Sequence, residues 1–246
     1  ASNLTIAENS AIGTLIGEFN ATDPDGEGNF TFSINSNSLL LWLPFDERNG
    51  TQAENLGSAN TDGALLNGAV FSTDEAKFGP SSLRVPLSSL NARVELSTPI
   101  ALGNGGASNP YSVSTWFKGL YAFSETVQGW RTLIRGTSTN YHIIINNQSN
   151  EIGIHRDGWF GSGKILSPIS SESYWQHLVA TFDGSKTTFY IDRNLLGSVQ
   201  KSPGLDIKSI GNFQNGSQHF AEYLDDFRVY SKVLSDREIS SLYHFS

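Results

Sequence analysis

The segment that decides the fold reads WQHLVATFDGS and spans Trp175–Ser185. Up to Phe182 it is rich in aromatic and other apolar side chains, a composition typical of a strand that is buried on at least one face. Asp183-Gly184 then supplies the backbone that a tight hairpin turn requires. The segment therefore predicts two antiparallel strands, at 175–182 and 186–191, that meet at this turn.

Short strand candidates recur on both sides of this hairpin at fairly even spacing, with turn signals such as Asn67-Gly68 between them. They cover residues 39–45, 82–85, 92–96, 112–117, 131–135, 141–146, 151–155 and 223–230. Such spacing predicts an all-β protein built as a two-sheet antiparallel sandwich. Within it we expect Trp116, Trp175 and Phe182 to fill the space between the sheets.

One segment near the end of the chain has a helical pattern instead. Ser235 is a good N-cap and Glu238 follows three residues later, which is the spacing of a capping box. Ile239 and Leu242 share one face of such a helix. We therefore expect a helix at 235–244.

The composition excludes several classes of protein. The net charge of −8 repels phosphate backbones, so nucleic acid is not an expected partner. There is no cysteine, which excludes disulfides, zinc-thiolate sites and cysteine nucleophiles. No apolar run reaches the length of a membrane span, so we expect no membrane insertion. For an extracellular or cell-surface protein of this size, which is where we expect the chain to act, the missing disulfide favours a bacterial or archaeal origin.

The first 34 residues read as short strands around an acidic turn, Asp23-Pro24-Asp25-Gly26. With Glu8 upstream, residues 1–34 resemble the first half of a cadherin repeat. The resemblance implies that Glu8, Asp23 and Asp25 bind Ca²⁺, and paired carboxylates on a rigid turn suit that ion. A plain β-turn with solvated acids is the alternative. The closing strands of such a repeat are missing, and a sandwich inserted into a repeat that resumes after Ser246 would fit this pattern.

Six motifs, including the segment quoted first, follow one another along residues 39–246. They are LWLPFDE at 41–47, NLG at 55–57 with DGAL at 62–65, FGPSSL at 78–83, YSVSTWFK at 111–118, the segment quoted first, and LDDFRVY at 224–230. In this order they resemble the laminin-G-like, pentraxin-related branch of the concanavalin A-like lectin/glucanase superfamily. The resemblance implies a jelly-roll sandwich that recognises glycans or proteins and often carries a structural Ca²⁺.

The sandwich is expected to hold a calcium site of its own. The first and last strands of this fold lie close together, which would bring the acids at their ends into one cluster with a nearby polar loop. Carboxylate and amide oxygens are the ligands that Ca²⁺ prefers. The expected ligands are Asp46, Asn55, Asn60, Asp62 and Asp226. Alternatively, the inward acid of the Asp225-Asp226 pair accepts hydrogen bonds from the backbone or from an arginine.

A glycine-rich loop is expected between residues 154 and 165. It carries Arg156, Asp157 and Trp159, and an exposed indole beside charged side chains can stack on a sugar ring and hydrogen-bond its hydroxyls. Further candidates for ligand contact are Trp130 and Tyr141. The alternative is that each aromatic side chain folds back to cover a sheet edge.

The sequence favours recognition over catalysis. Retaining glycosidases hold two carboxylates about 5–5.5 Å apart, whereas the acids here cluster in turns and at strand ends. A Gly-x-Ser-x-Gly elbow is also absent. We therefore expect no enzyme, but an extracellular, calcium-dependent binding or adhesion module of a larger protein, with a polysaccharide or cell-surface glycan as partner. A protein-interaction or spacer module of a cadherin-type adhesin is the alternative, and a glycan hydrolase or lyase a second one.

Overall fold

In a computed structural model, the chain divides into two units, Ala1–Ser36 and Asn37–Ser246. The structure describes residues 38–104, 107–122, 124, 129–138, 140–166, 174–213 and 217–245. The predicted cadherin-like ligands Glu8, Asp23 and Asp25 lie outside the described residues.

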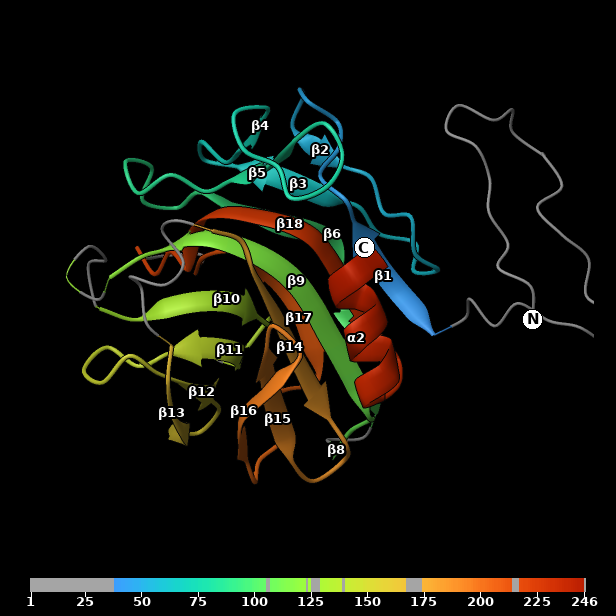
Figure 1. The fold of residues 1–246 in the computed structure, drawn as a ribbon, viewed down its shortest axis with the longest axis vertical. Coiled ribbons are helices and arrows are strands. Elements are labelled where there is room, and N and C mark those ends of the chain that lie inside the picture. The colour runs from blue at the N-terminus through green and yellow to red at the C-terminus, as the bar shows by residue number, and fades with distance from the viewer. Residues whose placement is uncertain are drawn as a thin grey trace, which may run out of the picture. The chain divides into compact units, whose positions relative to one another are not determined.

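Two antiparallel sheets form a sandwich, which confirms the predicted fold class (Figure 1). The first sheet has the order β16 (Asn194–Val199), β15 (Thr187–Ile191), β14 (Gln176–Phe182), β9 (Tyr111–Leu120), β18 (Ala221–Tyr230), β5 (Ser82–Arg84) and β4 (Val70–Ser72), and β1 (Leu39–Leu43) also pairs with β18. The second sheet has the order β13 (Trp159–Ile165), β12 (Glu151–His155), β11 (Tyr141–Ile145), β10 (Arg131–Arg135), β17 (Asp206–Ile210), β6 (Arg93–Ala101), β3 (Gly63–Leu66) and β2 (Gln52–Ala53). A short separate pair is formed by β7 (Gly103–Asn104) and β8 (Ala107–Ser108).

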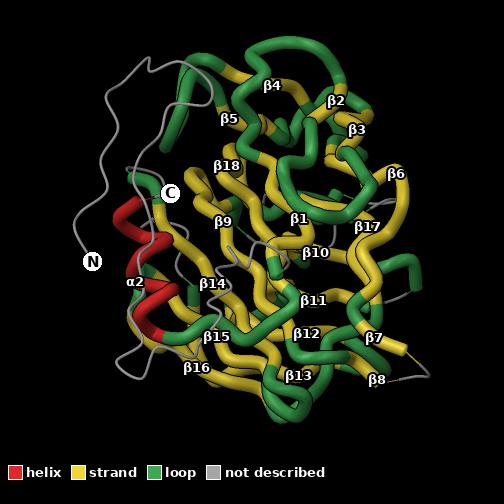
Figure 2. The backbone as a smooth tube through the Cα atoms, turned by 90° about the vertical axis from the view of Figure 1, so that its right-hand side faces the viewer, coloured by secondary structure: helices red, strands yellow, loops and turns green. Residues whose placement is uncertain are grey.

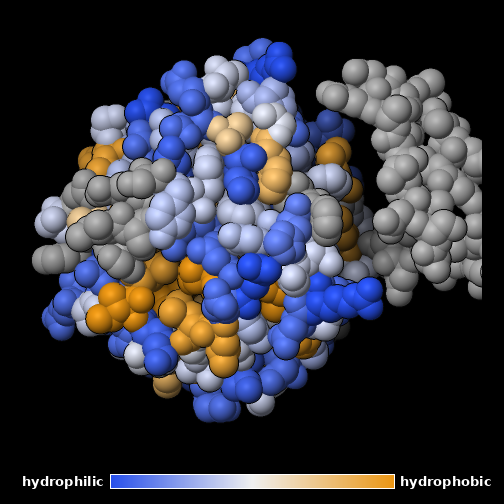
Figure 3. Space-filling model, in the orientation of Figure 1, coloured by the Kyte–Doolittle hydropathy of each residue, from blue (hydrophilic) through white to orange (hydrophobic). Residues whose placement is uncertain are grey.

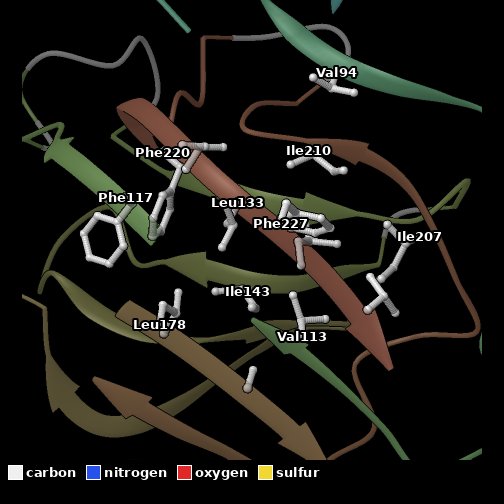
Figure 4. Packing of buried hydrophobic residues seen from close by; sticks show 14 of the residues in the cluster. Val94, Val113, Phe117, Leu133, Ile143, Leu178, Ile207, Ile210, Phe220 and Phe227 are labelled. Atoms are coloured by element: carbon white, nitrogen blue, oxygen red, sulfur yellow. The ribbon is translucent and has the colours of Figure 1, made fainter. Parts of the chain in front are cut away.

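The hydrophobic core lies between these two sheets. Phe117 of β9 and Phe227 of β18 in the first sheet belong to one core cluster with Leu133 of β10 and Ile207 of β17 in the second (Figure 4). All four side chains are fully buried. Burying a side chain of this size stabilises a fold by roughly 1.5–3 kcal/mol, so this layer dominates the stability of the sandwich.

The hairpin predicted from the quoted segment is confirmed. β14 pairs with β15 from Leu178 opposite Ile191 to Phe182 opposite Thr187. Gly184 has a φ of +104°, which residues other than glycine rarely adopt. The turn is closed by the Asp183 carboxylate, because its Oδ1 accepts hydrogen bonds from neighbouring backbone N–H groups of the turn.

The predicted helix is also confirmed, as α2 (Asp236–Phe245). The capping box forms in both directions: the Ser235 N–H donates to Glu238 Oε2 at 2.9 Å, and the Glu238 N–H donates to Ser235 Oγ at 3.4 Å. Ile239 packs against Val179 on the outer face of the first sheet, and Figure 2 shows α2 on the side of that sheet away from the second. No helix of the described residues is long and apolar enough to cross a membrane.

The prediction for two of the three aromatic residues was wrong. Phe182 lies in the core between the sheets, but Trp116 and Trp175 do not. Trp116 pairs with His177 on the outer face of the first sheet, where its ring lies 4.9 Å from that imidazole and 5.2 Å from the ring of Tyr243 in α2. Because a helix covers this outer face, β9 is buried on both faces, and its hydrophobic pattern cannot tell one face from the other.

The two sheets approach each other along one edge, where β13 lies beside β16. A Cβ atom on Gly197 of β16 would lie 3.0 Å from the carbonyl oxygen of Ser162 on β13. Leu195 and Ile165 on these edge strands are 68% and 65% exposed. Figure 3 shows that apolar surface on the face viewed gathers mainly in one area, whereas most of the face is hydrophilic.

Candidate functional site

Four side chains form a row across adjacent strands of the second sheet, and we name it the cross-strand row. Arg135 of β10 pairs with Tyr141 of β11, Tyr141 pairs with His155 of β12, and His155 pairs with Trp159 of β13. Directly paired residues of antiparallel strands project from the same face of a sheet. The register therefore places an arginine and three aromatic rings side by side on one surface.

A short turn brings Trp159 into this row. Only Arg156, Asp157 and Gly158 separate His155 from Trp159, and the Arg156 N–H donates to the Gly158 carbonyl at 3.0 Å. Asp157 and Gly158 have φ values of +58° and +130°. Both values lie in the region that favours Asn, Asp and Gly, so the sequence of the turn matches its backbone.

The row borders a cavity of about 200 Å³. Its walls are formed by Trp130, Tyr141, Ile144, His155 and Gln218. The ring centre of Trp130 lies 5.4 Å from that of Trp159 and 5.9 Å from that of His155, both edge to face, and Tyr141 lies 5.7 Å from His155. All four rings are half-buried, so part of each ring's surface is exposed to solvent.

The floor of this cavity is apolar, and close packing and a hydrogen bond fix the residues around it. Ile144 is 2% exposed yet does not belong to the core between the sheets, because it points to the outer face. Its cross-strand partner is Gly153, where a Cβ atom would lie 2.7 Å from the Trp159 indole. Beside them the Thr132 hydroxyl donates to Gln218 Oε1 at 2.8 Å, which fixes how the amide of Gln218 faces the cavity.

Of the four residues predicted to contact a ligand, the structure brings two together at the cavity and places the other two elsewhere. Trp130 and Trp159 come together at the cavity, although 28 residues of sequence lie between them. Arg156 instead donates to the Ser202 hydroxyl at 3.1 Å, and Asp157 is exposed in the turn. The prediction of a loop up to residue 165 was wrong, because Trp159 begins strand β13.

Sequence reasoning missed three members of this site. His155 and Arg135 end strands that were predicted correctly, and Gln218 lies just before β18. A cross-strand row depends on register, and each strand shift or bulge changes which residues meet. The register shifts near Ile134, so counting along β10 does not identify Arg135 as a neighbour of Tyr141.

The predicted approach of the first and last strands is confirmed, since β1 pairs with β18. β18 contains a one-residue bulge against β9 between Asp225 and Arg228, and Asp226 in this bulge has a φ of +49°. Its Oδ1 accepts hydrogen bonds from the Trp42 indole N–H at 2.7 Å and from Arg228, while Oδ2 is buried without a hydrogen-bond partner. Burial raises the pKa of Asp46, and the negative charge of Asp226 raises it further, so the two carboxylates repel each other.

The remaining predicted calcium ligands have other contacts. The Asn55 Oδ1 accepts the N–H groups of Trp42 and Gly57, at 2.8 and 2.7 Å, and its amide nitrogen donates to two carbonyls. Asp62 accepts the Asn55 N–H at 2.9 Å and the side-chain amide of Gln52. These contacts fold the loop back onto β1. Asn60 lies exposed in the same loop.

Both acids of the Asp225-Asp226 pair are buried. One accepts hydrogen bonds from the backbone and the other pairs with an arginine, the two kinds of partner named in the alternative prediction. Asp225 Oδ2 accepts the backbone N–H groups of Lys77 and Phe78 at 2.7 and 3.1 Å, whereas Asp226 pairs with Arg228 at 2.8 Å. Within the described part of the chain, no three His, Asp or Glu side chains come together as a metal-binding group. Among the predicted ligands, Asp46 and Asp226 are thus the two whose carboxylates interact, while Asn55 and Asp62 contact each other.

Comparison with known proteins identifies the family. Residues 91–240 match the family described as the concanavalin A-like lectin/glucanases superfamily. The match covers more than half of the chain, and the chain belongs to this superfamily. The resemblance of residues 1–34 to a cadherin repeat stays a prediction. No curated protein sequence matches the chain.

Solved structures share the fold at low sequence identity. Domain 4 of an extracellular arabinanase from Geobacillus stearothermophilus, solved with arabinotriose, is 17% identical with a TM-score of 0.59, and the match covers 84% of this chain and 98% of that domain. A Trypanosoma rangeli sialidase solved with 2,3-difluorosialic acid is 15% identical with a TM-score of 0.56, covering 84% of this chain and 33% of the sialidase. The binding domain of botulinum neurotoxin serotype D is 16% identical with a TM-score of 0.57, covering 85% and 52%.

Proposed function

We propose that this domain is a non-catalytic carbohydrate-binding module of an extracellular protein. The observation that carries the proposal is the cavity of about 200 Å³ walled by Trp130, Tyr141 and His155, with Trp159 against Trp130. Sugar rings bind proteins by placing their apolar C–H faces on aromatic side chains while polar groups bond the hydroxyls. The rings supply such faces, and the Gln218 amide supplies a polar group.

The neighbouring structures support this proposal without deciding it. The arabinanase domain comes from an extracellular enzyme and was solved in complex with arabinotriose, and the match spans nearly the whole of that domain. The same fold serves many functions, so the argument rests on the cavity rather than on the neighbours. An extracellular location and a glycan partner are therefore part of the proposal.

The side chains around the cavity support binding rather than hydrolysis. Retaining glycosidases need two carboxylates about 5–5.5 Å apart, and inverting ones need a pair about 6.5–9.5 Å apart. The residues that line the cavity are aromatic, aliphatic and amide side chains. The paired acids of the domain lie instead beside β1 and β18, where Asp226 is held by Arg228 and Trp42. We therefore propose that the domain is not an enzyme.

The proposal is tested by a glycan array with three proteins: wild type, Trp159→Ala and Trp175→Ala. Trp175 is a matched control, because it is also a half-buried tryptophan but contacts Tyr223 of the first sheet, at 6.4 Å. We expect wild type and the control to bind the same glycans and Trp159→Ala to lose them. Stacking of a sugar on an aromatic ring is worth about 1–2 kcal/mol, which corresponds to a loss of roughly five- to thirty-fold.

Two results of this array would contradict the proposal. The first is equal binding by wild type and Trp159→Ala, which would place any glycan site elsewhere. The second is the absence of binding to any glycan, which would favour the protein-interaction or spacer module of an adhesin. Circular dichroism of each variant serves as the control for folding.

We further propose that Ca²⁺ binds between Asp46 and Asp226. The buried Oδ2 atom of Asp226 lacks a hydrogen-bond partner, and the two carboxylates repel each other in the absence of a cation. A Cβ atom on Gly79 would lie 1.9 Å from Asp46 Oδ1, so the glycine leaves room for the Asp46 carboxylate. Ca²⁺ takes six to eight oxygens, so carbonyl groups and water would complete its coordination beside the two carboxylates. The bound ion would connect the segment that follows β1 to the bulge of β18.

Thermal melting with CaCl₂ and with EGTA tests the calcium proposal. An ion present at about 100 times its Kd stabilises the folded state by about 2.7 kcal/mol, which raises Tm by roughly 5–10 °C in a domain of this size. Asp46→Asn should reduce that shift, whereas Asp62→Asn should leave it unchanged. A melting temperature that is the same in both solutions, with no metal found by elemental analysis, would remove the site.

A further inference from the structure

Arg135 at the β10 end of the cross-strand row has unusual surroundings. Its guanidinium carbon lies 4.5 Å from the ring centre of Phe213 and 5.5 Å from that of Tyr141, so both rings are positioned to stack on it. The residue is only 8% exposed, and its Nε is buried without a hydrogen-bond partner. Stacking satisfies the faces of a guanidinium but leaves the N–H groups at its edge unused.

Other buried arginines of the domain have polar partners. Arg93 pairs with Glu95 at 2.6 Å, and Arg131 donates to Asn150 Oδ1 at the same distance. The side chain of Arg135 makes neither an ion pair nor a hydrogen bond with any residue that the structure describes. Burying a charge without a partner is costly, and buried charges in proteins are usually paired, so an unpaired guanidinium calls for a partner from outside the domain.

The position of Arg135 connects it to the proposed binding site. Tyr141 contacts Arg135 on one side and forms a wall of the cavity on the other. A ligand in contact with Tyr141 is therefore within one residue of the guanidinium. The N–H fork of arginine matches the two oxygens of a carboxylate, in a geometry that a neutral hydroxyl cannot reproduce.

We propose that the cavity selects glycans that carry a carboxylate, such as uronic or sialic acid units, and that Arg135 is the residue that determines this specificity. The inference rests on the proposed carbohydrate-binding function and deepens it. The aromatic rings of the row bind the sugar faces, and the guanidinium edge of Arg135 binds the carboxylate of one unit in a bidentate pair.

The charge of the domain permits such a ligand. Five of the acidic residues lie in the first 37 residues, which hold no Lys or Arg, so residues 38–246 contain 19 Asp and Glu against 16 Lys and Arg. The net charge of that segment is thus −3, against −8 for the whole chain. The cross-strand row and the cavity walls hold one cation and no carboxylate, so a bound acid meets no like charge there.

Isothermal titration of the wild-type domain with matched probes tests this inference directly. The probes are oligogalacturonate with its fully methyl-esterified form, and 3′-sialyllactose with lactose. We expect at least one acidic probe to bind about ten-fold or more tightly than its neutral partner, because a charge-assisted bidentate pair is worth about 1.5–3 kcal/mol. Equal affinity within both pairs would overturn the inference, and this comparison needs no variant.

Variants then assign the selectivity to one residue. Arg135→Gln should make the affinities for the acidic and the neutral probe of each pair equal, and Arg135→Lys should keep only part of the difference, because lysine lacks the fork. Lys201→Gln is the control, since Lys201 lies 4.7 Å from the Phe160 ring, outside the row. A preference that survives Arg135→Gln would overturn the inference. Binding of neutral glycans alone would also overturn the inference. If Trp159→Ala abolished that neutral binding, the proposed carbohydrate-binding function would still stand.

Discussion

The buried imidazole of His177 predicts a loss of stability in mild acid. His177 is fully buried on the outer face of the first sheet, where its Nε2 lies 2.8 Å from the Ser114 hydroxyl and its ring stacks on Trp116. Its Nδ1 has no hydrogen-bond partner. Burial lowers the pKa of His177 to about 3, and the positive charges of Arg228 and Lys77 contribute to this lowering. The folded state therefore holds this imidazole neutral.

The sign and size of the effect follow from the two pKa values. Between pH 6.5 and pH 3 the unfolded chain binds a proton on His177 that the folded protein does not, so lowering the pH favours unfolding. A pH of 5 lies about 1.5 units below the pKa of the imidazole in the unfolded chain, and this difference corresponds to about 2 kcal/mol of lost stability. The stability that comes from burying a neutral His177 is fully present above pH 6.5 and decreases as the pH falls below that value.

Urea unfolding at pH 7.5 and pH 5, on wild type and on His177→Phe, measures this contribution. The variant lacks the hydrogen bond to Ser114 at both pH values. The cost of that loss therefore cancels when the unfolding free energy of each protein at pH 5 is subtracted from its value at pH 7.5. We expect wild type to lose about 2 kcal/mol more than the variant between the two conditions. Equal losses in the two proteins would refute the claim that His177 stays neutral inside the fold.

Three further predictions concern other parts of the domain. Ser235→Ala should cost about 1 kcal/mol in urea unfolding by removing the helix cap, whereas Ser241→Ala in the same helix should cost less. Gly79→Ala should weaken the calcium-dependent rise in Tm, because the new Cβ would displace the carboxylate of Asp46; an unchanged rise would contradict this. Burial raises the pKa of Asp225 to about 7, so this residue makes stability fall as the pH rises from about 4 to 7, and Asp225→Asn should remove that part of the slope in urea titrations.

The sequence predicted the fold well where local signals agree. The Asp183-Gly184 turn, the Ser235 capping box and most strands of both sheets lie where their patterns placed them. These features depend on a few neighbouring residues whose conformational preferences are strong. Six strands of the two sheets were missed, namely β2, β3, β4, β13, β16 and β17. Of these, β16 is exposed over much of its length and β17 carries charged residues among its apolar ones.

The candidate site could be predicted only in part. Trp130 and Trp159 were recognised as aromatic residues in polar surroundings, but their contact depends on the pairing of four strands. The role of Arg135 depends on what is missing around it, and a sequence does not show which charges remain unpaired. The approach of Asp46 to Asp226 was predictable, because in this fold the first and last strands pair, whereas the hydrogen bonds that hold Asn55 were not.

The central claim is that this sandwich recognises a glycan through the cavity beside the cross-strand row. A crystal structure of the domain with the glycan that binds most tightly on the array tests it most directly. We predict a sugar ring in contact with Trp130 and Trp159, near the Gln218 amide. A glycan bound to another face, with this cavity holding only water, would contradict the account.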